Sequence, residues 1–505
     1  MISIERMRAV ESNSKWRGVP PRVLMENAGA GLAREIRKRA PSYEKVSVFA
    51  GTGNNGGDGL VTGRHLINSG ADLEVVLLGK PQNIPDGPAM RNWETLSEMD
   101  HNVNFHIIRD STEIKELELD KPSVAVDAML GIGVKGKPRE PISSAIDYIN
   151  GLESYVAAVD IPTGVDPVRG KTSGKATKCD LTVTFHKSKR GLENVPKEYL
   201  GELVTLDIGI PKSAEEMAGP GDVQQALPPR KMNSHKGENG RVLVIGGSSE
   251  FTGAPALSGL SALNTGADLV EILAPKRTAE VISSYSPDII THKFEGENLN
   301  DKGVERIRNE LGKFGAVIIG PGLGLKQETQ EATAKIMNLI RKQKTKLPVL
   351  FDADGLKISA DNKNILSELE CLITPHSGEF EILTGKKPGG SLEEKKKSVS
   401  KTSSDLEISI LLKSPVDICA GPNGEITLND TGNPGMTAGG TGDVLCGIAG
   451  AMMSLGATPY RSAVAASFLS GLAGDLCRNE KGYEFTASDV KDRIPNSIEK
   501  VREFW

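Results

Sequence analysis

Short, continuous apolar runs recur along the whole chain and alternate with stretches of helical periodicity. Strands that are apolar on both faces belong to parallel sheets covered by helices on both sides. The pattern therefore predicts an α/β protein. The expected strands are 46–50, 73–78, 124–127, 155–160, 181–185 and 202–207, and then 241–245, 269–273, 316–319, 349–352, 371–374, 408–412 and 416–420.

A break in this pattern divides the chain near its middle. The 505 residues exceed what one ordinary core accommodates. After the strand at 202–207 comes a polar stretch rich in proline and glycine, which includes Pro228-Pro229, and a new strand begins at Arg241. We expect two α/β domains, at 1–215 and 231–505, joined by a linker at 216–230.

Composition and charge argue against several functional classes. Hydrophobic residues make up 38% and charged residues 25% of the chain, as in globular proteins. The net charge of −5, with no strongly basic stretch, argues against a nucleic-acid partner. The five cysteines are scattered without a CxxC pair, which indicates a reducing, cytoplasmic location without a zinc site. No apolar leader or run of about 18 apolar residues is present, so we expect no membrane segment.

A glycine-rich acidic loop, 51–59, directly follows the first predicted strand and precedes a helical pattern that starts at Leu60. Glycines let the backbone approach a ligand, and the N–H groups at a helix start attract anions. The spacing is not GxGxxG, and a tight turn with asparagine caps is the structural alternative. The combination favours a ligand-binding loop over a tight turn.

Two further predicted strands end in acids, Asp127 and Asp160. The carboxyl ends of parallel strands face the ligand crevice, so both acids should converge on the glycine loop. A single strand-end aspartate is as often a helix cap. Three converging loops favour a site, and Asp160 is its best candidate general acid or base.

A second glycine loop, Gly439-Gly440-Thr441-Gly442, precedes Asp443 and a clear apolar helix. Its N–H groups would face an anion. Asp443 could serve as an ordinary helix cap. With the glycines before it, we favour a carboxylate that deprotonates a substrate hydroxyl while phosphate is transferred.

Other strand ends in the second half carry polar strings. GPGLG (320–324), TPHSGE (374–379) and Lys413-Ser-Pro-Val-Asp417 each follow a predicted strand. An isolated histidine is more often structural than a ligand contact. Because His376 follows a buried strand within this string, we favour a substrate contact.

The motifs of the first half resemble the YjeF-type N-terminal domain, an NAD(P)H-hydrate epimerase. The resemblance covers about residues 1–210 and implies a Rossmann-like three-layer sandwich. It implies a potassium ion bound by Asn55, Asp127 and Thr163, whose oxygen atoms suit a hard cation. The implied substrate contacts are Asn54, Asn55, Gly56, Gly57, Asp58, Gly131, Ile132, Gly133, Val134, Lys135, Gly136, Lys137 and Asp160.

The motifs of the second half, with SHKG (234–237) and IGGS (245–248), resemble the ribokinase-like ADP/ATP-dependent NAD(P)H-hydrate dehydratases. This resemblance covers about residues 230–505 and implies a second three-layer sandwich. It implies hydrate contacts at Ala254, Gly322, His376 and Asp443. It also implies nucleotide contacts at Lys413, Ser414, Pro415, Val416, Asp417, Gly439, Gly440, Thr441 and Gly442, although many relatives have glycine where Ser414-Pro415 stands.

Together the two domains resemble the bifunctional NAD(P)H-hydrate repair enzymes. That implies the substrates NADHX and NADPHX, ADP (or ATP) with Mg²⁺, and K⁺ in the first domain, and we expect a homo-oligomer. One alternative is a vitamin or sugar kinase with an N-terminal regulatory domain, since the GGTGD loop fits both. Another is a first domain that binds nucleotide without catalysis, against which Asn55, Asp127 and Asp160 argue.

Overall fold

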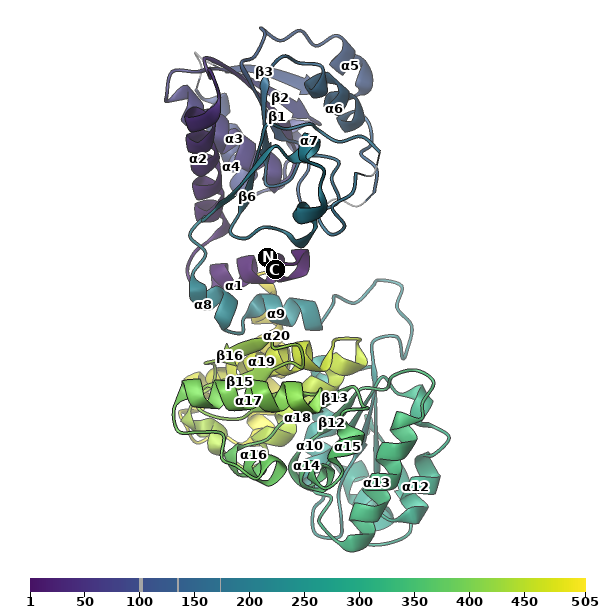
Figure 1. Ribbon diagram of the computed structural model, residues 1–505. Helices are drawn as coiled ribbons and strands as arrows, with labels where there is room; N and C mark the ends of the chain where they lie inside the picture. Colours follow the sequence, from purple (N-terminus) through teal and green to yellow (C-terminus); the bar gives the residue numbers. More distant parts are fainter. Residues whose placement is uncertain (100–102, 134–135, 173) are drawn as a thin grey trace. The chain divides into compact units, whose positions relative to one another are not determined.

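A computed structural model describes residues 1–99, 103–133, 136–172 and 174–505 (Figure 1). The chain forms two compact units, Met1–Pro211 (unit 1) and Lys212–Trp505 (unit 2). The stretch 216–230, which we expected to be a linker, lies within unit 2 and contains α9 (Pro220–Ala226), which packs against α19 (Pro459–Lys481). Its glycine and proline mark a helix start, since Gly219 is the N-cap and Pro220 the first helical residue.

Unit 1 is built on a seven-stranded parallel sheet in the order β3-β2-β1-β4-β5-β6-β7. The helices α2, α3 and α4 cover one face of the sheet, and α5 and α6 cover the other (Figure 1). The strands are β1 (Lys45–Gly51), β2 (Asp72–Leu78), β3 (Val103–Ile108), β4 (Val124–Ala128), β5 (Tyr155–Val159), β6 (Leu181–Phe185) and β7 (Glu202–Leu206). The helices are α1 (Ile4–Trp16), α2 (Pro21–Arg39), α3 (Asn54–Ile67), α4 (Pro88–Ser97), α5 (Ser111–Lys115), α6 (Ile142–Asn150) and α7 (Lys197–Leu200).

Unit 2 is built on a nine-stranded sheet in the order β10-β9-β8-β11-β12-β13-β14-β15-β16. Its strands are β8 (Arg241–Ile245), β9 (Leu269–Pro275), β10 (Ile289–Phe294), β11 (Ala316–Ile319), β12 (Val349–Phe351), β13 (Cys371–Ile373), β14 (Ser409–Leu412), β15 (Asp417–Ala420) and β16 (Ile426–Asn429). The strands from β10 to β14 are parallel, whereas β15 and β16 pair antiparallel with their neighbours.

Helices cover both faces of this second sheet (Figure 1). One layer contains α10 (Gly253–Thr265), α18 (Thr441–Ser454), α19 and α20 (Ala487–Arg502). The other contains α12 (Asp301–Ile307), α13 (Gln327–Arg341), α14 (Ala353–Ala360), α15 (Lys363–Leu366), α16 (Ser377–Thr384) and α17 (Leu392–Leu406). The helices α8 (Lys212–Glu216) and α11 (Lys276–Tyr285) complete the unit.

The prediction of two α/β sandwiches is confirmed, and the predicted strands agree with the structure to within one or two residues. Three strands were missed: β3, β10 and β16, each at the edge of its sheet. Edge strands are partly exposed, so their sequences mix polar and apolar residues. The interior strands are buried along their length, as their continuous apolar runs predicted.

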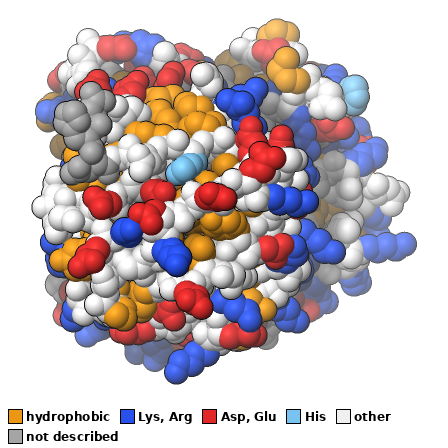
Figure 2. Space-filling view, turned by 90° about the horizontal axis from the view of Figure 1, so that it is seen from above, with side chains coloured by type: hydrophobic (Ala, Val, Ile, Leu, Met, Phe, Trp, Pro, Cys, Tyr) orange, Lys and Arg blue, Asp and Glu red, His pale blue; other side chains and the backbone are white. Residues whose placement is uncertain are grey.

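The surface carries both basic and acidic side chains. On the face in Figure 2, basic and acidic side chains are interspersed, with small apolar groups between them. Within the described ranges, no helix combines the length and apolar character needed to cross a membrane. All five cysteines, each at a described position, are buried and free.

Candidate active sites

The first glycine loop is mostly helical, which corrects the prediction that a loop extends to Gly59. Helix α3 begins at Asn54, with Gly53 as its N-cap. A Cβ atom on Gly56 would lie 1.9 Å from the backbone oxygen of Gly51. Gly56 is therefore required for the close packing of α3 on the end of β1, and this region uses glycine for packing as well as for ligand access.

A cavity of about 730 Å³ in unit 1 brings together most of the predicted epimerase residues. Its lining includes Asn54, Asn55, Asp58, Gly131, Ile132, Gly133 and Asp160. The predicted contacts Gly56, Gly57, Gly136 and Lys137 are not part of this lining. Val134 and Lys135 lie outside the described residues.

Asp160 lies directly after β5 and pairs with a buried lysine that we did not predict. The Lys189 ammonium, 1% exposed, contacts the Asp160 carboxylate and donates to the Thr184 hydroxyl at 3.0 Å. The same carboxylate oxygen accepts hydrogen bonds from Thr184 Oγ1 at 2.9 Å and the Phe185 N–H at 3.1 Å. These three donors, one of them a cation, hold the Asp160 carboxylate in a fixed orientation.

Asp160 also has an unusual backbone, with φ of 61° in the left-handed region. A non-glycine residue adopts this conformation at a cost and is found where the surroundings impose it, often at active sites. Lys189 could have been suspected from the sequence, because it closely follows the carboxyl end of the predicted strand 181–185.

Three more carboxyl groups line the same cavity, on Asp58, on Asp86 and on Glu11 of α1. Burial raises the pKa of Asp58 well above its usual value, and the nearby Asp160 and Glu11 raise it further. Burial likewise raises the pKa of Glu11 to about 7; Asp160 adds to the rise, whereas Lys189 and Arg8 oppose it. Sequence analysis missed Glu11 and Arg8 because nothing local connects α1 with the glycine loops.

Asp127, Thr163 and Asn55 form a polar cluster beside this cavity. The Asp127 carboxylate is fully buried and accepts from Thr163 Oγ1 at 2.6 Å and from the Thr163 N–H at 2.7 Å. Burial raises the pKa of Asp127, and the two Thr163 hydrogen bonds oppose that rise. The Asn55 Nδ2 atom is buried without a hydrogen-bond partner among the described residues, and the Asn55 side chain lies against Gly131.

In unit 2, Asp443 lies in the first turn of α18, as the sequence predicted. Gly440 is the N-cap, with φ of 93°, and the preceding glycine loop leads directly into the helix. Burial raises the pKa of Asp443 to about 7; the neighbouring Asp352 adds to the rise and Lys413 opposes it. This carboxyl can therefore gain and lose a proton near neutral pH.

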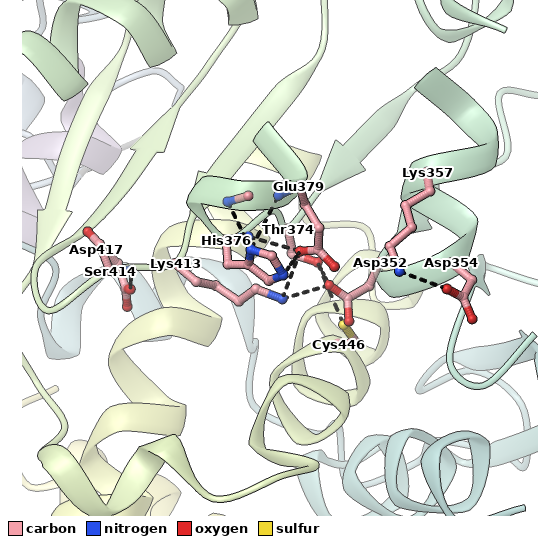
Figure 3. Close-up of polar contacts among 11 residues, drawn as sticks. Asp352, Asp354, Lys357, Thr374, His376, Glu379, Lys413, Ser414, Asp417 and Cys446 are labelled. Atoms are coloured by element: carbon pink, nitrogen blue, oxygen red, sulfur yellow. Dashed lines mark hydrogen bonds and ion pairs between the residues drawn. The ribbon is translucent and has the colours of Figure 1, made fainter. Parts of the chain in front are cut away.

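A buried ion pair lies beside Asp443, at the carboxyl ends of β12 to β14 (Figure 3). Lys413 Nζ donates to Asp352 Oδ1 at 2.8 Å and lies 3.9 Å from Glu379 Oε2. Thr374 Oγ1 donates to the same Asp352 oxygen at 2.7 Å. Burial opposes the charged forms, but the pairing lowers the pKa of Asp352 and raises that of Lys413, so both are ionised.

This pair adjoins the glycine loop of α18. A Cβ atom on Gly442 would lie 3.5 Å from Lys413 Nζ and 3.9 Å from Asp352 Oδ2. The predicted nucleotide residues Lys413 and Gly442 are therefore neighbours, although they are far apart in the sequence.

His376 has a structural role in addition to its predicted contact. It is the N-cap of α16, and its Nδ1 accepts from the N–H groups of Gly378 at 3.0 Å and Glu379 at 3.2 Å. The Glu379 carboxylate accepts in return from the His376 N–H at 2.9 Å. Because Nδ1 is an acceptor here, the proton of the neutral ring lies on Nε2, which is 3.5 Å from the Glu379 carboxylate in a side chain that is 60% exposed.

The other predicted hydrate contacts, Ala254 and Gly322, are also neighbours. Gly322 lies in the GPGLG loop after β11, and a Cβ atom there would lie 3.6 Å from the Ala254 Cβ and 2.8 Å from that of Phe251. The GPGLG loop in turn contacts the segment after β12, where the Gly324 N–H donates to Asp354 Oδ2 at 3.0 Å.

The Ser414-Pro415 segment, where the sequence departs from many relatives, forms a compact turn. The Ser414 N–H donates to Asp417 Oδ1 at 3.0 Å, and Asn429 Nδ2 donates to Asp417 Oδ2 at 3.1 Å. Burial raises the pKa of Asp417 to about 6, and these hydrogen bonds oppose the rise. In Figure 3, Ser414 and Asp417 lie apart from the Asp352–Lys413 pair.

Two other features of unit 2 lie outside the predicted sites. A cavity of about 580 Å³, lined by parts of 227–239 and α20, contains none of the predicted site residues. Glu271, His292 and Glu310 are close enough to bind a metal, but Arg241 contacts Glu271 and Arg306 contacts Glu310. These arginines pair with the two carboxylates, so we interpret the cluster as an ion-pair network and not as a metal site.

Comparison with known families assigns both halves of the chain. Residues 21–191 match the family described as YjeF-related protein N-terminus, and residues 242–496 match the family described as NAD(P)H-hydrate dehydratase. The bifunctional NAD(P)H-hydrate repair enzyme Nnr of Methanothermobacter thermautotrophicus is 41% identical over 498 residues, covering 98% of this chain and 94% of the relative. The enzyme of that name from Archaeoglobus fulgidus is 39% identical over 504 residues, covering 100% and 99%.

A solved structure resembles a little over half of this chain in fold. A ribokinase-like superfamily protein from Enterococcus faecalis superposes with a TM-score of 0.50 at 22% identity, covering 57% of this chain and 96% of that chain. An ADP/ATP-dependent NAD(P)H-hydrate dehydratase from Bacillus subtilis, co-crystallised with ATP and Mg²⁺, has a TM-score of 0.47 at 26% identity, covering 55% and 96%.

Proposed function

The chain belongs to the bifunctional NAD(P)H-hydrate repair enzymes, and on that basis we propose which of its residues perform each reaction. These enzymes restore NADH and NADPH whose nicotinamide ring has been hydrated at C6. Unit 1 interconverts the R and S hydrates, and unit 2 dehydrates the S-hydrate.

Asp443 is the base of the dehydratase site, and its position carries this assignment. It lies at the N-terminus of α18 with a pKa of about 7, so it can accept the proton of the C6 hydroxyl at neutral pH. The hydroxyl oxygen then attacks the terminal phosphoryl group of the nucleotide. Phosphorylation turns hydroxide, a poor leaving group, into phosphate, whose elimination restores the ring.

The nucleotide is ADP, bound by the loop Gly439–Gly442 and the segment Lys413–Asp417. The N–H groups at the start of α18 stabilise the transferred phosphoryl group. Asp352 Oδ2, which faces Gly442 of this loop, is an oxygen donor of the kind that Mg²⁺ requires, while Lys413 and Thr374 bond the other oxygen of this carboxylate. Mg²⁺ bound there would shield the phosphate charge. Ala254, Gly322 and the exposed side chain of His376 position the hydrate.

Asp160 is the acid–base residue of the epimerase site. Its carboxyl group is held by Lys189, Thr184 and Phe185 and lines the cavity, where it can exchange a proton with water or with the substrate. Asn54, Asp58 and the segment 131–133 line the cavity around it and hold the substrate.

Asn55, Asp127 and Thr163 have the donor chemistry of a potassium site. The buried Asp127 carboxylate supplies a negative charge, and the side-chain amide of Asn55, with its unpartnered nitrogen, is free to turn its oxygen toward a cation. K⁺ bound there would offset the charge of the carboxylates around the cavity. The Thr163 hydroxyl, already bonded to Asp127, fixes the orientation of that carboxylate.

A mixture of R and S NADHX tests both assignments through the recovery of NADH absorbance with ADP. The full chain should recover the whole mixture, Asp160→Asn only the S fraction beyond spontaneous epimerisation, and Asp443→Asn neither. Full and rapid recovery by Asp160→Asn would remove its role in epimerisation. Recovery of NADH by Asp443→Asn would show that Asp443 is not the dehydratase base. Replacing ADP with ATP tests the nucleotide assignment.

A further inference from the structure

Helix α1 is fixed next to the Asp160–Lys189 pair by backbone pairing. The Ile2 N–H donates to the Ser188 carbonyl at 3.0 Å, and the Arg190 N–H donates to the Ile2 carbonyl at 3.3 Å. This short parallel bridge pairs Ile2 with Lys189 immediately before α1 begins. Ser3 then caps the helix by accepting from the Arg6 N–H at 3.2 Å. The position of α1 is therefore tied to the segment that carries Lys189.

One side of α1 forms a wall of the epimerase cavity. Met7, Arg8 and Glu11 are all part of its lining, and the neighbouring Ile4 and Val10 are buried. Among the residues that the structure describes, no hydrogen bond or ion pair satisfies the Glu11 carboxyl group. Asp160, in contrast, accepts from Thr184, Phe185 and Lys189. The cavity thus holds a fixed carboxylate, Asp160, and facing it the carboxyl groups of Glu11 on α1 and Asp58 on α3.

We propose that Glu11 is the second acid–base residue of the epimerase site and shares with Asp160 the single proton that inversion at C6 requires. This inference rests on the role proposed for Asp160 and extends it to a two-residue mechanism. The unpaired carboxyl on α1, opening into the same cavity as the Asp160–Lys189 pair, carries it.

The chemistry balances with these two groups and water. The protonated carboxyl donates its proton to the C6 hydroxyl, the C6–O bond breaks, and water leaves while the N1 electron pair forms a C6=N1 iminium. A water molecule then attacks C6 from the other face, and the second carboxylate accepts its proton while the electrons return to N1. The proton has moved from one carboxyl to the other, which leaves the site ready for the reverse inversion.

The charged groups that face Glu11 come from every wall of the site. Arg8 lies on the same helix, Asp58 on α3, Asp160 after β5 and Lys189 beyond β6. Lys189 pairs with Asp160 and not with Glu11, so we place the shared proton on Glu11. Raising the pH through about 7 removes this proton, and epimerisation should slow in both directions.

The test compares the full chain with Glu11→Gln, Glu11→Asp and the control Glu5→Gln, an exposed glutamate on the same helix. Epimerisation of the R-hydrate is followed from pH 6 to 9 by NADH recovery with ADP and added dehydratase in excess. We expect Glu11→Gln to lose about 100-fold or more in epimerisation and to lose the decline above pH 7. Glu11→Asp should keep that decline at a reduced rate, and Glu5→Gln should match the full chain.

The calorimetric unfolding transition of unit 1 shows that each variant is folded there, and dehydration of pure S-hydrate by unit 2 should not change. A Glu11→Gln variant within about threefold of the full chain, or one that keeps the decline above pH 7, would overturn the proposal. A decline that disappears in Asp58→Asn but persists in Glu11→Gln would assign the proton to Asp58 and also overturn it.

Two readouts separate this proposal from the role of Asp160. If Asp160→Asn loses epimerisation and Glu11→Gln does not, the proposal fails while the assignment of Asp160 stands. If Asp160→Asn is unaffected, the assignment of Asp160 itself fails. In water labelled with heavy oxygen, each inversion should introduce one labelled oxygen at C6; retention of the original oxygen would indicate ring opening and contradict the mechanism.

Discussion

Replacing Asp443 with asparagine should abolish dehydration while leaving the fold at least as stable. Asparagine keeps the size of the side chain but cannot accept the proton of the C6 hydroxyl. Removing a general base typically costs about 100- to 10,000-fold in rate. The measurement is NADH recovery from pure S-hydrate with ADP, and Asp301→Asn is the matched control, because Asp301 is also an acid in the first turn of a helix but is exposed.

The pH dependence gives this prediction a second readout. Because the pKa of Asp443 is about 7, the base is protonated below neutrality, and the rate should fall about tenfold for each pH unit below 7. The residual rate of Asp443→Asn should lack this acid limb, whereas Asp301→Asn should keep it.

Stability should change in the opposite direction from activity. The pKa of Asp443 rises from 3.8 to about 7 on folding, so the folded state loses stability as the pH rises between these values. Above pH 7 this shift corresponds to a loss of stability of about 4 kcal/mol, which a favourable interaction with the helix N-terminus of about 0.3–1 kcal/mol offsets only in part. At pH 8 Asp443→Asn should therefore unfold at an equal or higher temperature. An acid limb that persists in the variant, or a loss of activity under about threefold, would refute the reasoning.

Three further predictions concern unit 1. Lys189→Met leaves a buried carboxylate unpaired and should destabilise this unit by about 3–5 kcal/mol, seen by calorimetry with the transition of unit 2 as reference; a cost below about 1 kcal/mol would contradict the ion pair. Gly56→Ala places a Cβ 1.9 Å from the Gly51 oxygen and should lower the unfolding temperature, whereas Gly53→Ala, which meets nothing within 4 Å, should not; equal effects would argue against the packing role. Asp127→Asn should make epimerisation independent of K⁺, measured against tetramethylammonium at equal ionic strength, and an unchanged K⁺ response would remove Asp127 from the cation site.

The fold could be predicted from the sequence wherever strands are buried on both faces. Each residue of Val124–Ala128, for example, is buried, and its apolar run was recognisable. The strand Ile289–Phe294 alternates buried and exposed positions at the edge of its sheet and was not recognised. Burial produces the pattern that identifies a strand, so the pattern weakens at a sheet edge.

The sites could be predicted only in part, for a related reason. Asp160 and Asp443 were found because each adjoins a strand end or helix start marked by glycine. Glu11 and Arg8 enter the cavity through the pairing of Ile2 with Lys189, a contact between residues nearly two hundred positions apart. No local pattern in the sequence records such a contact.

Both units contain a buried lysine–aspartate pair, but they use it differently. In unit 1 the paired Asp160 is itself the proposed acid–base residue. In unit 2 Lys413 pairs with Asp352, and the negative charge of Asp352 raises the pKa of a separate residue, the base Asp443. Asp352→Asn can keep the hydrogen bond from Thr374 while it removes this repulsion and leaves Lys413 free to favour the ionised base. The acid limb of dehydration should therefore move below pH 7, measured as kcat/KM for the S-hydrate; a limb that stays in place or moves upward would show that burial alone sets the pKa of Asp443.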